Sequence, residues 1–135
     1  MAGRVVVSTL NNDTGVLNTQ NGMAGIPKAW VYFDGQTSST ATIIGSFNVS
    51  SVTRNSTGNY TTNFTTAMPN TNYAWVSSCL ANDTSGTNGN FMLAGGRGTG
   101  ITEKTTTAIR LVSGSTSSNV FWDNPALSLI IFSAT

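Results

Sequence analysis

The chain has 135 residues, of which 39% are hydrophobic and only 8% are charged, and its formal net charge is +1. This length fits a single domain that buries about two-thirds of the surface of its unfolded chain. Globular domains carry charge on roughly 25% of their residues, whereas Ser, Thr, Asn and Gly make up about half of this chain. Hydroxyl and amide groups therefore solvate the surface, and the low charge permits copies of the chain to pack closely.

Composition also indicates which classes of partner to expect and in which cellular compartment the protein is made. The six cationic residues stand singly along the chain, so nucleic-acid binding, which needs a basic patch, is not expected. No apolar run approaches about twenty residues, so we expect no membrane insertion, and the first residues do not have the pattern of a signal peptide. Cys79 is the single cysteine. It allows no internal disulfide, and we expect a buried strand residue in a protein made in a reducing cytoplasm.

Residues 1–24 differ from the rest of the chain. Residues 5–7 favour one short strand, and turn-rich clusters at residues 11–15 and 18–22 follow it. We interpret the segment as an extended attachment arm that reaches on the order of 70 Å; a frayed terminus is the alternative. Its apolar side chains favour cover by a neighbouring subunit. They belong to Val5, Val6, Val7, Leu10, Val16 and Leu17.

Residues 25–135 have the pattern of a β domain. Aromatic and β-branched residues alternate with small polar ones, as in half-buried strands, and no apolar repeat has helical spacing. Turn residues recur every ten residues or so. We therefore predict an all-β fold, an antiparallel β-sandwich or jelly roll of about eight strands with an extended N-terminal arm. The expected strands are residues 28–33, 40–47, 47–50, 60–65, 72–80, 91–93, 105–112 and 127–132.

A hairpin is the central feature of this domain. Phe47 and Val49 share one face of its first strand, and Tyr60 and Phe64 share one face of its second. Residues 54–58 supply the turn with Asn, Ser and Gly, which tolerate tight reversals. We expect Tyr60 and Phe64 to point into the core.

The sequence does not favour catalysis. It has no His, which excludes Ser-His and Cys-His nucleophilic pairs and metal sites built on imidazole. A glycosidase needs two carboxylates about 5–10 Å apart, but each acid here lies in a turn-like context where Asp is commonly structural. The acids are Asp13, Asp34, Asp83, Glu103 and Asp123. We predict no enzyme activity, no cofactor and no metal site.

Recognition is expected in polar loops. The Gly-rich stretch at residues 95–100 lacks the Lys-Ser/Thr ending of a phosphate loop, and together with residues 82–90 it is typical of exposed recognition loops. We select Asn88, Arg97 and Trp122 as candidate contacts with a ligand or host. Aromatic rings can stack on sugars, but the other two tryptophans, Trp30 and Trp75, lie within predicted strands, so we expect them in the core. Six Asn-x-Ser/Thr triplets are attributed to composition and strand alternation rather than to glycosylation.

Two segments resemble a known family. Residues 25–35 read G-I-P-K-A-W-V-Y-F-D-G, and residues 46–73 read S-F-N-V-S-S-V-T-R-N-S-T-G-N-Y-T-T-N-F-T-T-A-M-P-N-T-N-Y. In this order they are similar to a domain at the ends of tail-fibre proteins of tailed bacteriophages, notably marine and cyanobacterial ones. The likeness resumes weakly at residues 126–132, and residues 80–107 lie outside it.

The resemblance implies a homotrimer in a virion. We therefore predict a structural protein on the exterior of a phage particle, either a fibre tip or a head decoration, which acts in assembly and host adhesion. Residues 1–24 would attach it to other capsid or tail proteins, and residues 25–135 would form the β-sandwich whose loops meet a host surface glycan. A carbohydrate-binding β-sandwich module without a virion role is the alternative.

Overall fold

The computed structural model describes residues 9–12, 15–18, 26–80, 90–94, 104–115 and 120–133. All secondary structure in these ranges is β, in eleven strands. The strands are β1 (Thr9–Asn12), β2 (Gly15–Asn18), β3 (Ala29–Asp34), β4 (Thr42–Phe47), β5 (Val49–Ser56), β6 (Asn59–Phe64), β7 (Ala74–Leu80), β8 (Asn90–Ala94), β9 (Ala108–Ser115), β10 (Val120–Phe121) and β11 (Ala126–Phe132). The predicted all-β fold is confirmed, although the described ranges hold more strands than the eight expected.

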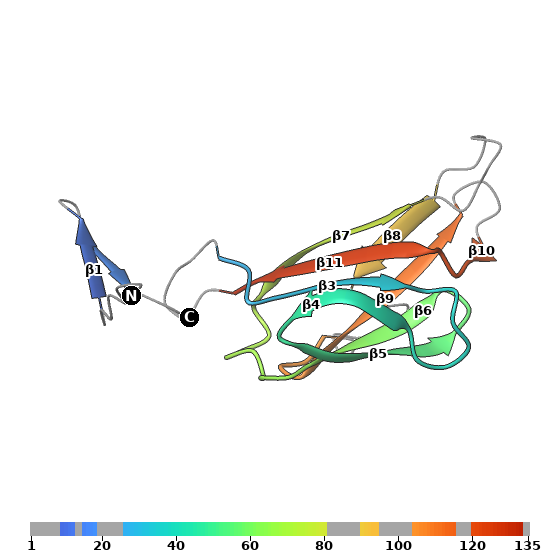
Figure 1. The fold of residues 1–135 in the computed structure, drawn as a ribbon, viewed down its shortest axis with the longest axis horizontal. Helices are drawn as coiled ribbons and strands as arrows, with labels where there is room; N and C mark the ends of the chain where they lie inside the picture. Colours follow the sequence, from blue (N-terminus) through green and yellow to red (C-terminus); the bar gives the residue numbers. More distant parts are fainter. Residues whose placement is uncertain are drawn as a thin grey trace, which may run out of the picture.

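Two antiparallel sheets pack as a sandwich (Figure 1). One has the order β4-β3-β11-β7, and the other has the order β10-β9-β6-β5, with β8 also paired to β9. At one margin of the sandwich β7 lies beside β8. At the other margin the chain passes from β4 into β5 through the single residue Asn48. The sheets therefore approach each other along both margins.

Strand β9 is paired along both of its edges. Leu111 pairs with Tyr60 of β6 and with Ala94 of β8, so β6 and β8 lie on opposite edges of β9. Ser115 pairs with Asn90 of β8 and with Val120 of β10. It follows that β6 and β10 succeed one another along the same edge, which brings the turn between β5 and β6 next to β10.

The core lies between the sheets and follows the period-two alternation of the strands. Tyr60 and Phe64 are buried, as predicted, and Phe33 meets the ring of Tyr60 edge-to-face with 5.4 Å between the ring centroids. Phe64 makes the same kind of contact with Tyr73, at 6.0 Å. The largest fully buried apolar side chains are Tyr60, Tyr73, Phe33, Ile109, Leu111, Leu127, Leu129, Ile131, Val31 and Val52.

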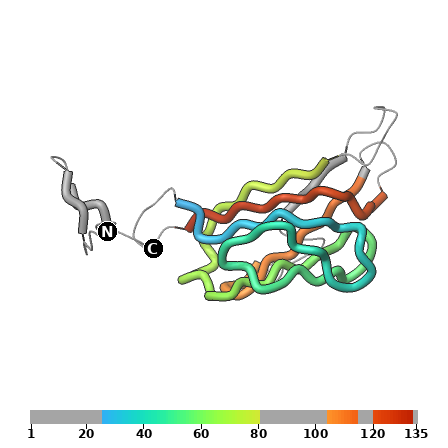
Figure 2. The backbone as a smooth tube through the Cα atoms, viewed as in Figure 1, coloured from blue at the N-terminus to red at the C-terminus, as the bar shows by residue number. Residues whose placement is uncertain are grey.

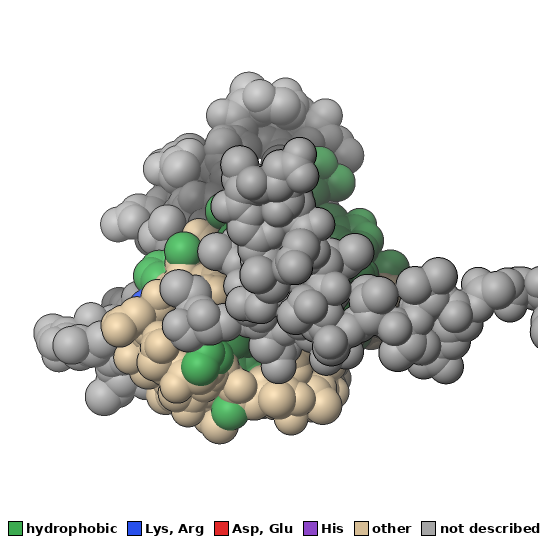
Figure 3. All heavy atoms as spheres, turned by 90° about the vertical axis from the view of Figure 1, so that its left-hand side faces the viewer, with side chains coloured by type: hydrophobic (Ala, Val, Ile, Leu, Met, Phe, Trp, Pro, Cys, Tyr) green, Lys and Arg blue, Asp and Glu red, His purple; other side chains and the backbone are tan. Residues whose placement is uncertain are grey.

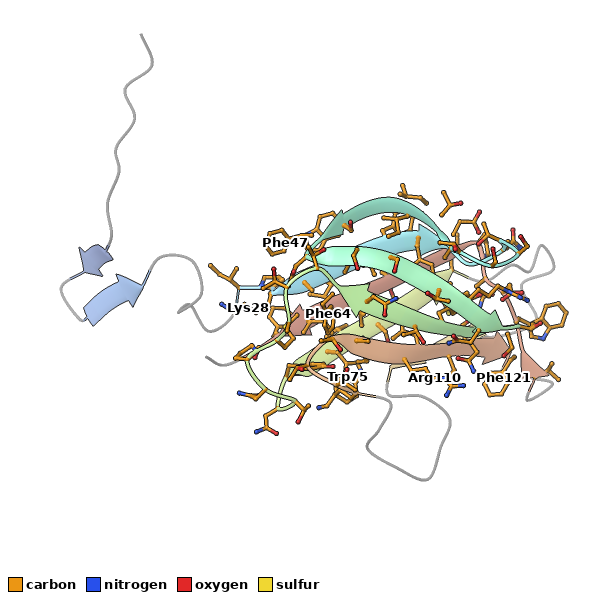
Figure 4. The ribbon with its side chains drawn as sticks, turned by 90° about the horizontal axis from the view of Figure 1, so that it is seen from below. Lys28, Phe47, Phe64, Trp75, Arg110 and Phe121 are labelled. Carbon is orange, nitrogen blue, oxygen red and sulfur yellow. The ribbon has the colours of Figure 1, made fainter. Side chains whose placement is uncertain are left out.

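The predicted first strand of the central hairpin is wrong in one respect. Phe47 and Val49 belong to different strands, because Asn48 between them has a φ of 56° and turns the chain from β4 into β5. Asn tolerates this left-handed conformation better than most residues. Its Nδ2 donates to the carbonyl oxygens of Lys28 (3.0 Å) and Thr66 (3.1 Å), and its Oδ1 accepts from the Thr66 N–H (2.7 Å). Phe47 therefore faces outward while Phe64 lies between the sheets (Figure 4).

A second predicted boundary also differs. Strand β9 begins at Ala108 rather than at Thr105, because Thr105 Oγ1 accepts hydrogen bonds from the N–H groups of Thr107 (3.2 Å) and Ala108 (3.0 Å). Such local side-chain bonds hold a turn and compete with strand pairing.

The N-terminal segment contains a hairpin. Strands β1 and β2 pair antiparallel in a sheet of their own, with Leu10 opposite Leu17 and Val16 opposite Asn11. The expected strand at residues 5–7, with Val5, Val6 and Val7, lies outside the described residues. The attachment role of residues 1–24, and the boundary after them, stay predictions.

Candidate interaction surface

One end of the sandwich is organised by the carboxylate of Asp123, which follows β10. Arg54 of β5 approaches it with Nη2 2.7 Å from Oδ2 and donates a further bond from Nε at 3.1 Å. The N–H of Gly58 donates to Oδ1 at 2.8 Å, and the hydroxyl of Tyr60 donates to the same oxygen at 2.6 Å. Figure 2 shows the turn between β5 and β6 at the same end of the molecule as the segment between β10 and β11.

The electrostatics of this network favour a permanent ion pair. Burial alone would raise the pKa of Asp123, but the hydrogen bonds from Arg54, Tyr60 and Gly58 outweigh it and hold that pKa below its usual value. The bond to Asp123 raises the pKa of Arg54, and burial together with the same carboxylate raises the pKa of Tyr60. The carboxylate is thus charged and fully engaged near neutral pH, which suits a structural role.

Trp122, a predicted contact residue, is presented by this end. Its side chain is 50% exposed, as expected from its loop context. Its backbone is fixed on both sides, because its N–H donates to the Ser113 carbonyl at 3.1 Å and its carbonyl accepts from Ser113 Oγ at 2.6 Å. A fixed backbone with a free aromatic ring is well suited to binding. The other two predicted contacts, Asn88 and Arg97, lie outside the described residues.

The acidic residues that the structure describes accept hydrogen bonds that hold turns in place. Asp34 accepts the N–H of Gln36 at 2.8 Å in a turn, and Asp123 holds the network above. Among the residues that the structure describes, no three His, Cys, Asp or Glu side chains gather into a group that could hold a metal ion.

The outer face of the sheet β4-β3-β11-β7 is apolar and exposed. Its register places Phe47, Trp30, Ile130 and Val76 side by side across all four strands. Trp30 is 40% exposed, Phe47 56% and Val76 60%. The prediction that Trp30 lies in the core is therefore wrong: it occupies an outward position, between the inward Ala29 and Val31.

Two further side chains extend this band. Tyr32, two residues after Trp30 in β3, is exposed on the same face. Ile44 is exposed at the bulge where the pairing register between β3 and β4 shifts. We call Trp30, Tyr32, Ile44, Phe47, Val76 and Ile130 the apolar face. Figure 3 shows hydrophobic side chains gathered at the right-hand side of the body, over this sheet.

The outer face of the opposite sheet has the reverse character. Asn63 of β6 donates to Ser51 Oγ at 3.0 Å, and Asn55 of β5 donates to Thr61 Oγ1 at 2.8 Å. Arg110 of β9 donates to Asn59 Oδ1 at 2.7 Å. Side-chain hydrogen bonds thus run across three strands, and this face is satisfied in contact with water.

A cluster of one lysine and two aromatic rings lies on the inward side of β7, at the edge of its sheet. The Nζ of Lys104 is 4.8 Å from the ring centroids of both Tyr73 and Trp75, and it donates to the Tyr73 carbonyl at 3.3 Å. Trp75 lies on the inward side of its strand but at its edge, so it is one-third exposed rather than a full core residue as predicted. The Tyr73 hydroxyl donates to the Thr105 carbonyl at 2.9 Å, and burial raises its pKa to about 12. This cation–π cluster closes the end of the core.

Sequence reasoning missed the apolar face, although a signal for it was present. The runs A-W-V-Y-F in β3 and L-I-I-F in β11 are apolar at consecutive positions. Such runs are typical of strands covered on both faces.

Comparison of the chain with protein-family models, with curated proteins and with solved structures found no match. No helix long and apolar enough to cross a membrane occurs among the residues that the structure describes.

Proposed function

We propose that this protein is a structural component on the exterior of a bacteriophage particle, a tail-fibre tip or a head decoration that acts in assembly and host adhesion. The observation that carries the proposal is where the two family-like segments lie. Residues 25–35 include β3, and residues 46–73 include β5 and β6. They also provide Gly35, Arg54 and Tyr60 around the Asp123 network. The resemblance therefore involves the framework of the fold and not a short surface motif.

Two physical features support this proposal. The low charge of the chain suits a protein packed among like subunits. The exposed ring of Trp122 at one end gives a rigid point of contact for a host glycan. The mechanism is assembly and adhesion without turnover, in contact with other capsid or tail proteins.

The test is to locate the chain on particles. Virions purified by density gradient from the culture that produces the chain should contain it in stoichiometric amounts by mass spectrometry, and an antibody against it should label the tail tip or the head surface. Its absence from intact particles would overturn the proposal.

The adhesive role has its own test. Particles that carry Trp122→Ala should contain normal amounts of the chain but adsorb to host cells several-fold more slowly. The matched control is Val120→Ala, which removes another exposed apolar side chain at the same end. Equal adsorption by the two variants would argue against a contact at Trp122.

A carbohydrate-binding module without a virion role is the second candidate. The observation that favours it is the exposure of Trp30 and Tyr32, two residues apart on one face of β3. Such rings can stack on successive sugars. A glycan array would support this candidate if binding by the purified chain is lost in Trp30→Ala and kept in Trp122→Ala.

A further inference from the structure

We propose that the apolar face packs against the same face of a second copy of this chain, with the two β3 strands antiparallel. The proposal concerns contact between copies and does not depend on a place in a virion. A pair of copies would stand in place of the homotrimer that the resemblance implies, and the two assemblies can be told apart by mass.

The apolar face exposes a large area. A free aromatic residue exposes about 150–250 Å². Since the six side chains of the apolar face are between 36% and 60% exposed, together they offer on the order of 500 Å² of apolar surface. This is at the upper end for the largest patch on a monomer, and it is most of the roughly 800 Å² that one partner gives to a stable interface.

The outer faces of the two sheets contrast in their chemistry. Across β5, β6 and β9 the outward side chains hydrogen-bond to one another. Across β4, β3, β11 and β7 the most exposed outward residues are apolar, with Ser128 and Ser78 as the polar residues of the neighbouring row. Both sheets belong to one small domain of low charge, so solvation alone does not account for the difference. The apolar sheet face is the one to be covered.

Charged residues of opposite sign lie at the two ends of β3. Outward positions alternate with the buried Ala29, Val31 and Phe33, so Asp34 falls in the outward phase at one end of β3. Lys28 directly precedes the strand at its other end. No outward position between them on the four described strands carries a charge. When a second copy packs antiparallel on this face, each Lys28 lies near the end of the partner copy's β3 that carries Asp34. Parallel packing would instead place like charges together, which is unfavourable.

The same features explain why a copy of this chain is a better occupant than a sugar. Sugar sites combine aromatic rings with several placed hydrogen-bonding groups. The row formed by Phe47, Trp30, Ile130 and Val76 contains a single polar atom, the indole N–H of Trp30. Sheets that pack face-to-face at about 10 Å interdigitate apolar side chains of this kind.

The experiment is sedimentation velocity of the full chain between about 1 and 100 μM. We expect a reversible dimer. A triple variant, Phe47→Thr with Val76→Thr and Ile130→Thr, keeps the strand preference of the three positions. It should weaken association at least about 100-fold. The matched control, Val120→Thr with Trp122→Ser, polarises exposed residues away from the face and should associate like the wild type. Far-UV circular dichroism and a cooperative melt verify that each variant is folded.

Charge variants make a second, independent arm that leaves the apolar side chains in place. Lys28→Glu should weaken the dimer about five- to tenfold, and Lys28→Glu combined with Asp34→Lys should restore it. A monomer at 100 μM, a trimer, or a triple variant that associates like the wild type would overturn the proposal. Loss of association in Lys28→Glu without recovery in the double variant would overturn the antiparallel arrangement.

Discussion

The carboxylate of Asp123 holds together the end of the sandwich at which Trp122 is exposed. Asp123 accepts hydrogen bonds from β5, from the turn after it and from β6, so three segments depend on one side chain. Removing an acceptor of this kind leaves half-buried donors without a partner, and that loss exceeds the modest gain of any one bond. Gly58 adds a steric condition, because its φ of 62° and the nearby Ser113 carbonyl leave no place for a Cβ.

Replacing Asp123 by Asn tests this network and its dependence on pH. We expect Asp123→Asn to lower the free energy of unfolding by about 2–3 kcal/mol at pH 7, because the charge and part of the acceptor capacity are lost. The folded state lowers the pKa of Asp123, so its stabilisation is fully present above the unfolded value of about 3.9 and is lost as the pH falls through the folded value. Urea unfolding should therefore show a constant difference from wild type between pH 5 and 8 and a shrinking one below about pH 4. A difference that persists unchanged at pH 3 would contradict this assignment.

At the scale of elements, the alternation of apolar and polar residues predicted well which side chains point into the core, and it predicted poorly where strands end. The pattern placed Tyr60 and Phe64 correctly, since every second residue of β6 is apolar or small. It could not place the break at Asn48, because that break depends on a left-handed backbone held by bonds to Lys28 and Thr66, which are 20 and 18 residues away. The Asp123 network was equally inaccessible, because its donors lie more than 60 residues away in the chain.

Asn48 offers a test of how the chain passes between the sheets. Asn48→Ala loses three hydrogen bonds and puts a Cβ in the left-handed region, so we expect it to cost about 2–4 kcal/mol of unfolding free energy. Asn48→Gly loses the same bonds without the backbone strain, and should be about 1 kcal/mol more stable than the Ala variant. Chemical denaturation of the matched pair measures the strain directly. Equal stabilities would mean that the backbone at Asn48 relaxes out of the left-handed region.

At the scale of the whole molecule, the two outer faces differ in composition: one carries the repeated Asn and Thr residues, and the other carries apolar residues. The Asn-x-Ser/Thr triplets at Asn48, Asn55, Asn59 and Asn63 provide a turn and a hydrogen-bonded face. Sequence reasoning attributed these triplets to composition and strand alternation, and the structure adds a hydrogen bond for each of these four Asn side chains. The continuous apolar runs of β3 and β11 carry the opposite face, whose cover by another copy is the proposal above. The polar groups of one outer face are hydrogen-bonded to one another, and the other outer face exposes apolar side chains that the proposed second copy would cover.

The N-terminal segment supplies the last test, because its strands share no sheet with the sandwich. β1 and β2 pair with each other, so deleting residues 1–24 should remove no backbone pairing from the two large sheets. We expect the truncated chain to keep its far-UV spectrum and to melt within about 3 °C of the full chain, the shift expected for less than about 1 kcal/mol. If residues 1–24 are the attachment arm, the truncated chain should also fail to join particles. A fall in melting temperature of 8 °C or more would mean that the arm stabilises the sandwich. Normal occupancy on particles would instead place the attachment in residues 25–135, most directly at one of the two outer faces.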